Sequence, residues 1–145
     1  NPEESVGDVI DKFVRDFKLY EKKPDSRLFG FNHPNPSPDK PYGYEDWVTI
    51  PEDMEVPAPL VKKKVKGDMY AALTIDFPNF HEWKLITDWV EKNQKWEADY
   101  APEGGEIMAG CLEEHLNWVY ASHRGWTENG PDGKIDLLLP IKIRT

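Results

Sequence analysis

A cluster of groups that can carry chemistry lies in the stretch GCLEEHLNW, at residues 110–118 of the 145-residue chain. It holds two carboxylates, Glu113 and Glu114, and one imidazole, His115. A carboxylate that is partly removed from water can hold a cation or accept a proton as a general base, and an imidazole titrates near neutral pH. Short acidic runs are also common on solvated surfaces. The residue types alone therefore leave a functional role and a surface role open for Glu113.

The direction of each side chain follows from the strand that this stretch predicts. Side chains at positions i and i+2 of a strand share a face, so Glu114 points the same way as Leu112 and Leu116. Glu113 and His115 point to the opposite face. If helices cover the leucine side, Glu113 and His115 face the free side of the sheet, where loops can close over them to form a groove. We therefore expect Glu113 to be the functional carboxylate and Glu114 to be incidental.

Aromatic residues supply candidates for the walls of a binding cleft. The chain has six Trp, six Tyr and six Phe residues. Alternation along residues 44–51 places Trp47 on the face opposite Tyr44, so one of the two is expected to face the cleft. Trp118 lies beside the loop after the acidic segment, and Trp89 can reach the cleft edge from a helix. For each ring alone, packing in the core or on the surface is the alternative.

The composition narrows the class of protein. The net charge is −9, which disfavours nucleic acid as a partner of this chain because phosphates need a basic face. No segment has the ~18 apolar residues of a membrane span, and the single cysteine cannot form an internal disulfide, which fits a cytoplasmic setting. The four histidines and Cys111 lack the spacing of a metal site, and no Gly-rich phosphate loop is present. We therefore expect no metal and no cofactor.

The predicted helices and strands occur in an order that repeats. Apolar residues at helical spacing predict helices over residues 7–22 and 80–93. Strands are predicted over residues 27–33, 44–51, 60–75 and 133–143 and in the GCLEEHLNW segment, and loops over residues 34–43 and 121–133. Residues 1–55 and 56–145 each then form one βαββ unit, although the first lacks its opening strand, which we expect upstream of Asn1. Two pseudo-symmetric units predict one α+β domain over residues 1–145, an antiparallel sheet with both helices on one face and an aromatic ligand cleft.

Four segments in this order resemble the GyrI-like, or effector-binding, domain family, which also forms the ligand-sensing half of some multidrug regulators. They are YGYEDWVTIPEDMEV (42–56), KVKGDMYAAL (64–73), CLEEHLN (111–117) and DGKIDLLLPIK (132–142). The resemblance implies a cleft that binds diverse lipophilic, often cationic, molecules, with a buried Glu that falls on Glu113. A family aromatic residue falls on Tyr70. The signature Tyr of the family falls on His115, a departure that puts Tyr-dependent chemistry in doubt.

Three functions fit these residues, and the sequence does not separate the first two. The favoured one is a module that binds a lipophilic, cationic or electrophilic, drug-like compound with Glu113 in its cleft. The aromatic residues expected to line that cleft are Tyr44, Trp47, Tyr70, Trp89 and Trp118. The second is a hydrolase that opens the cyclopropane ring of genotoxic natural products, as the resemblance implies for some relatives, with Glu113 as general base and His115 assisting.

The third function is a protein-interaction inhibitor that acts through the acidic surface of the chain. No helix-turn-helix motif is present, so this chain alone is not expected to bind DNA. An upstream DNA-binding domain or a protein partner stays open. No membrane partner is expected.

Overall fold

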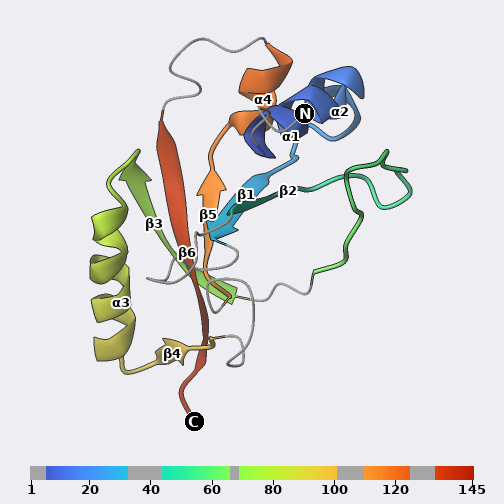
Figure 1. Cartoon of the computed structure of the whole chain (residues 1–145). Helices are drawn as coiled ribbons and strands as arrows, with labels where there is room; N and C mark the ends of the chain where they lie inside the picture. Colours follow the sequence, from blue (N-terminus) through green and yellow to red (C-terminus); the bar gives the residue numbers. More distant parts are fainter. Residues whose placement is uncertain (1–5, 33–43, 66–68, 101–109, 125–132) are drawn as a thin grey trace, which may run out of the picture.

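A computed structural model describes residues 6–32, 44–65, 69–100, 110–124 and 133–145. Six strands of this part form one antiparallel sheet in the order β2-β1-β5-β6-β3, with β4 paired to β6 (Figure 1). The strands are β1 (Leu28–Asn32), β2 (Tyr44–Val48), β3 (Met69–Asp76), β4 (Trp96–Ala98), β5 (Leu112–His115) and β6 (Lys134–Ile143). The helices are α1 (Val6–Asp16), α2 (Leu19–Lys22), α3 (Trp83–Lys92) and α4 (Trp118–His123), with a short 3-10 turn, η1 (Phe80–Glu82), before α3.

The two longer helices bury apolar stripes against the sheet. The stripe of α1 packs against Leu28 of β1 and consists of Ile10, Phe13 and Val14. Ile86 and Val90 of α3 lie one turn apart and pack against β6. None of the described helices is both long and apolar enough to span a membrane. Burial of these stripes accounts for the helical pattern that the sequence showed.

Both helices cover the same face of the sheet. Directly paired residues of antiparallel strands share a face, and Leu28 under α1 pairs with His115, which pairs in turn with Ile135 of β6. Leu139, which packs against α3, lies four residues further along β6 and therefore points to this face as well. Figure 1 shows α3 beside β3, well away from α1, α2 and α4. The predicted α+β class is confirmed, whereas the pseudo-symmetry and the opening strand upstream stay predictions.

Several predicted elements differ in detail from the structure. The helix predicted over 7–22 is broken at Lys18, whose φ of 52° turns the chain so that Leu19 becomes fully buried. Residues 60–65 form no strand, and Val61 is 74% exposed, because no described strand pairs with this segment. The helix α4 lies partly where a loop was predicted, and β4 was not predicted. The loop predicted over 34–43 and most of the one over 121–133 lie outside the described residues.

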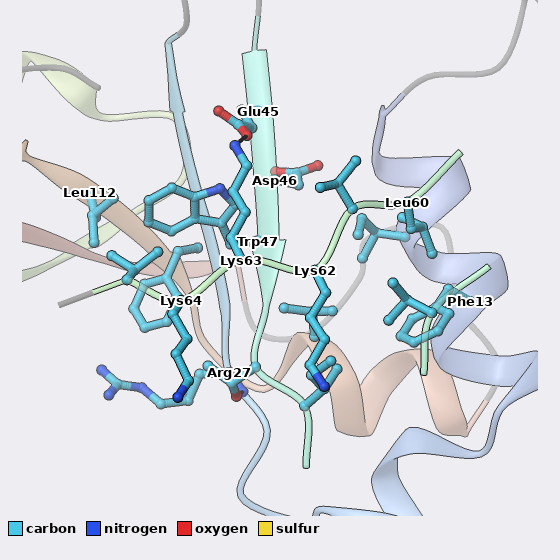
Figure 2. Close-up of a pocket in the computed structure, with 18 of the residues that line it drawn as sticks. Phe13, Arg27, Glu45, Asp46, Trp47, Leu60, Lys62, Lys63, Lys64 and Leu112 are labelled. Atoms are coloured by element: carbon cyan, nitrogen blue, oxygen red, sulfur yellow. Dashed lines mark hydrogen bonds and ion pairs between the residues drawn. The ribbon is translucent and has the colours of Figure 1, made fainter. Parts of the chain in front are cut away.

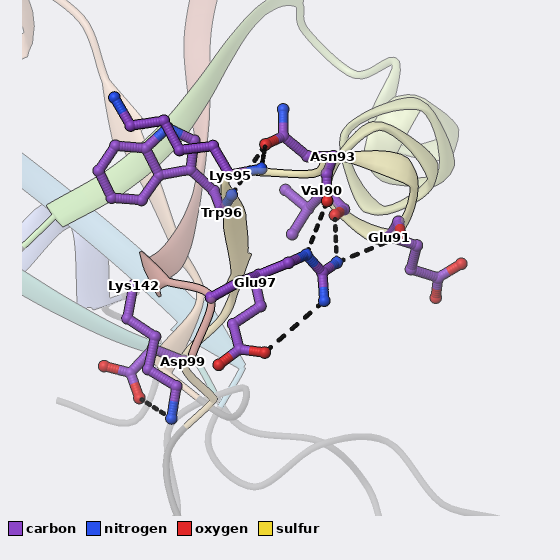
Figure 3. Close-up of polar contacts among 9 residues, drawn as sticks. Val90, Glu91, Asn93, Lys95, Trp96, Glu97, Asp99 and Lys142 are labelled. Atoms are coloured by element: carbon purple, nitrogen blue, oxygen red, sulfur yellow. Dashed lines mark hydrogen bonds and ion pairs between the residues drawn. The ribbon is translucent and has the colours of Figure 1, made fainter.

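The carboxyl end of β6 is tied to α3 by Arg144 (Figure 3). Its guanidinium donates hydrogen bonds to the main-chain carbonyls of Val90 at 3.3 Å, Glu91 at 3.3 Å and Asn93 at 2.7 Å. The last carbonyls of a helix have no partner within the helix and carry the negative end of its dipole, so a cation there is favourable. Arg144 therefore fastens the end of α3 to the sheet on which the site is built.

Candidate functional site

Glu113 lies on the helix-bearing face, so the expectation that it faces the free side of the sheet is wrong. Glu113 pairs with Leu137 of β6, and Leu137 belongs to the apolar cluster against which Trp83 of α3 packs. Leu112 points the other way and packs with Leu138. The face of β5 that carries Leu112 is thus buried by apolar and aromatic side chains of the neighbouring strands, and no described helix covers it.

Three neighbouring strands bring two carboxylates together on this face. Gly30 of β1 pairs with Glu113 of β5 on one side and with Asp46 of β2 on the other. Neighbouring strands lie about 4.8 Å apart, so the α-carbons of the two acidic residues are about 10 Å apart. Within the part of the chain that the structure describes, neither carboxylate has a hydrogen bond or an ion pair. The two acidic residues therefore flank a position that has no side chain.

Tyr44 and His115 complete this group. The ring of Tyr44 covers Gly30, since a methyl group built on that glycine would lie only 2.1 Å from the Tyr44 hydroxyl oxygen. The same hydroxyl lies 3.4 Å from Nε2 of His115, within hydrogen-bond reach. The imidazole in turn meets the ring of Trp118 edge to face, with 5.5 Å between centroids. We call Tyr44, Asp46, Glu113 and His115 the acidic cluster.

Burial sets the charge of the acidic cluster. Glu113 is only 6% exposed, and burial, with a smaller effect of the Asp46 charge, raises its pKa from 4.5 to about 7. Burial also raises the pKa of Asp46 to about 6. It lowers the pKa of His115, and it raises that of Tyr44, together with the neighbouring acidic charges. At neutral pH the imidazole and the phenol are therefore uncharged, and the cluster is negative without an internal cation to balance it.

A cavity of about 800 Å³ lies at β2, and residues 59–65 contribute to its wall (Figure 2). Asp46 belongs to this wall, on the side of β2 that faces α1, while Trp47 points to the other side of the strand. The apolar wall residues on the side of Asp46 are Ile10, Phe13, Val48, Ile50, Val56 and Leu60. Glu113 is not part of the wall, because β1 lies between β5, which carries Glu113, and β2. The volume falls in the range of pockets that hold drug-sized ligands.

The predicted aromatic residues fall into separate groups. Tyr44 lies near both His115 and Glu113, and Trp118 contacts His115; whether the four residues form one ligand site stays a prediction. Trp47 and Tyr70 line the far part of the cavity, on the face away from the helices, where they pack against Phe31, Leu112 and Leu138. The buried indole N–H of Trp47 has no hydrogen-bond partner among the described residues. Trp89 is 53% exposed on α3.

Glu114 was expected to be incidental, but it is a buried carboxylate that forms an ion pair with the half-exposed side chain of Arg27. Both of its carboxylate oxygens accept hydrogen bonds from Arg27, at 2.7 and 2.6 Å, and the guanidinium also lies over the ring of Phe29. These two partners are 87 residues apart in the chain, so no local spacing could reveal them. Asp46 was also missed. Its signal was available, because it alternates with Tyr44 and Val48 and so puts a charge on an otherwise aromatic and apolar face.

Other reactive groups do not extend the site. Among the described residues, no group of three or more His, Cys, Asp or Glu side chains could hold a metal ion. Burial raises the pKa of Cys111 to about 11, so its thiol stays protonated at neutral pH and is a poor nucleophile. The chemistry available at the site is therefore that of two carboxylates, a phenol and a neutral imidazole.

An α+β sheet that places a negative, largely buried cluster beside a drug-sized cavity is typical of a domain that binds small molecules. The chain belongs to the Cass2 family of integron-associated effector binding proteins, whose family model matches residues 1–141. This is a GyrI-like effector-binding family, so the resemblance seen in the sequence is confirmed. Comparisons with curated proteins and with solved structures found no match. Family membership assigns the protein to the small-molecule-binding, effector-binding class.

Proposed function

We propose that the protein binds a lipophilic, drug-like cation, whose charge is held by Glu113 and whose apolar part enters the cavity at β2. The observation that carries this proposal is the pair of acidic residues, the buried Glu113 and the half-buried Asp46, that have no cationic partner among the described residues. An ionised carboxylate removed from water is costly unless an opposite charge compensates it. A bound cation supplies that charge, whereas a neutral ligand of the same shape does not.

Aromatic rings support the same choice of ligand. Tyr44 covers the floor of the acidic cluster at Gly30, and Trp118 lies behind His115. The faces of such rings attract cations, and the attraction grows where water is excluded. Since Tyr44 and His115 are both neutral at neutral pH, neither competes with a ligand for the carboxylates. An anionic ligand finds no compensating charge in this group.

The proposal is tested with two probes of similar shape, tetraphenylphosphonium and the uncharged triphenylphosphine oxide, by isothermal titration calorimetry at pH 8. We expect the cation to bind at least about tenfold more tightly than the oxide, since a charged contact contributes roughly 1.5–3 kcal/mol. Glu113→Gln should weaken cation binding by about tenfold or more and leave binding of the oxide unchanged.

The control is Glu91→Gln, which makes the same change of net charge at an exposed position of α3 and should bind both probes like the wild type. Equal affinity for the two probes in the wild type would count against a cation site. So would cation binding that Glu113→Gln leaves unchanged.

The raised pKa of Glu113 favours a second candidate function, a hydrolase of strained cyclopropanes. A general base is most effective when its pKa lies near the working pH, and burial brings Glu113 to about 7. In this reaction the oxygen of water attacks a cyclopropane carbon and its proton passes to Glu113. The ring C–C bond breaks, and its electron pair moves into the conjugated carbonyl of the substrate, whose oxygen is later protonated. The Tyr44 hydroxyl, 3.4 Å from Nε2 of His115, is a group that can donate a hydrogen bond to this oxygen.

Binding and hydrolysis are separated by incubating a cyclopropane-bearing alkylating compound with the protein and analysing the products by mass spectrometry. A product heavier by one water, formed by the wild type and not by Glu113→Gln, identifies the hydrolase. Quenching of Trp fluorescence together with recovery of the intact compound would show that the protein binds the compound without hydrolysing it.

A further inference from the structure

We propose that Asp46 is a second charge contact, and that the site prefers flat molecules with a positive charge at each end over monocations. This inference rests on the proposed function and specifies its ligand class. Among the described residues, Asp46 and Glu113 have neither a hydrogen bond nor an ion pair, and the register of their strands fixes the distance between them.

The register of three strands fixes the spacing of the two charges. Asp46 and Glu113 both pair with Gly30, so they lie in one line across β2, β1 and β5. Their α-carbons are separated by two strand spacings, about 10 Å in total. No β1 side chain stands between them, because the intervening residue is glycine. The ring of Tyr44 occupies the space over this glycine, so a flat molecule that joins the two carboxylates would stack on that ring.

The two carboxylates differ in their access to a ligand. Glu113 is 6% exposed and without a described partner, so it lies at the closed end of the line. Asp46 belongs to the wall of the cavity at β2, so it lies at the open end. A monocation at either end leaves the other carboxylate uncompensated. A dication of matching length compensates both, and a cavity of about 800 Å³ leaves room for the apolar remainder of the molecule.

The size of the preference follows from Coulomb attraction. A monocation bound at Glu113 acts on Asp46 from about 10 Å, whereas a second cationic group acts on it from about 4 Å. The attraction is inversely proportional to distance, so the nearer charge interacts more than twice as strongly. Because desolvation of the second cationic group offsets part of this gain, we expect a preference of about tenfold for the dication.

Two probes with the same biaryl frame test the proposal: methyl viologen, with a pyridinium at each end, and 1-methyl-4-phenylpyridinium, with one. Calorimetry at pH 8 and 0.15 M salt, above the pKa of both acidic residues, should give about tenfold tighter binding of the dication to the wild type. Asp46→Asn should bring the ratio close to one and change monocation binding by less than about twofold. The Glu91→Gln control should keep the ratio of the wild type.

The outcomes separate this inference from the proposed function. Failure of the wild type to bind either probe, or binding that Glu113→Gln does not weaken, overturns the proposed function and the inference with it. Binding that depends on Glu113 but is equal for the two probes overturns the inference alone. A dication preference that survives in Asp46→Asn does the same, because it then arises from the general negative field of the protein. Circular dichroism checks folding, and Asp46→Ser is the second variant if Asp46→Asn does not fold.

Discussion

Replacing Glu113 by Gln should stabilise the protein at alkaline pH and not at acidic pH. Burial raises the pKa of this carboxyl from 4.5 to about 7, so the folded state binds its proton more tightly than the unfolded state does. Stability from this group is present below pH 4.5 and is lost as the pH rises to about 7 and beyond. The difference in pKa corresponds to about 3 kcal/mol. We therefore expect Glu113→Gln to exceed the wild type by about 2–3 kcal/mol at pH 8 and to match it near pH 4.5.

The assay is urea unfolding followed by Trp fluorescence at half-unit steps between pH 4.5 and 8.5. The quantity of interest is the difference in free energy of unfolding between variant and wild type, because other titrating groups cancel in it. Glu91→Gln provides the control, with a difference that stays near zero across the range. A flat difference profile for Glu113→Gln, or a variant less stable than wild type at pH 8, would refute the argument that Glu113 is buried as an uncompensated acid.

Four further predictions follow from the site and its supports. Affinity for a lipophilic cation should increase from pH 6 to pH 8, the range in which the two carboxylates ionise, and calorimetry in buffers of different ionisation enthalpy should detect proton release; constant affinity would contradict this. Gly30→Ala should displace the ring of Tyr44, cost about 1–3 kcal/mol in urea unfolding and alter the near-ultraviolet circular dichroism, whereas a wild-type spectrum would argue against the overlap. Arg27→Met should leave Glu114 buried without its cation and cost roughly 2 kcal/mol, with partial recovery in the double variant that also carries Glu114→Leu; an additive loss would exclude the pairing. Arg144→Ala should lower the free energy of unfolding by about 1–2 kcal/mol and speed amide hydrogen exchange in the last turn of α3. Unchanged exchange there would show that the hydrogen bonds of Arg144 do not stabilise this turn.

Hydrophobic periodicity was sufficient to predict the class of fold. The apolar stripes of α1 and α3 and the buried run of β6 are each long enough to show their period in the sequence alone. The short elements were not predictable in this way. α4 has six residues and β4 has three, and both depend on packing or pairing with parts of the chain far away in sequence.

The candidate site was predicted in part. Alternation correctly separated Glu113 from Glu114, and Tyr44 from Trp47, because the strand period is fixed by the backbone. It did not tell which face the helices cover, since both faces of β5 are buried and each face carries one glutamate. Asp46 joined the site only when the register of β1 and β2 was known. Register is a long-range property that a single strand does not encode.

The ion pair between Arg27 and Glu114 has a consequence for how the sheet assembles. Adjacent glutamates in β5 mean that a slip of one residue would still put a carboxylate on the helix side, so the alternation of charge does not by itself exclude a misaligned strand. Arg27 distinguishes the observed register from the slipped one, because its two hydrogen bonds and its contact with Phe29 hold Glu114 on the opposite face and next to β1. The pair of Arg27 and Glu114 thus stabilises the strand register in which Glu113, and not Glu114, lies on the helix-bearing face.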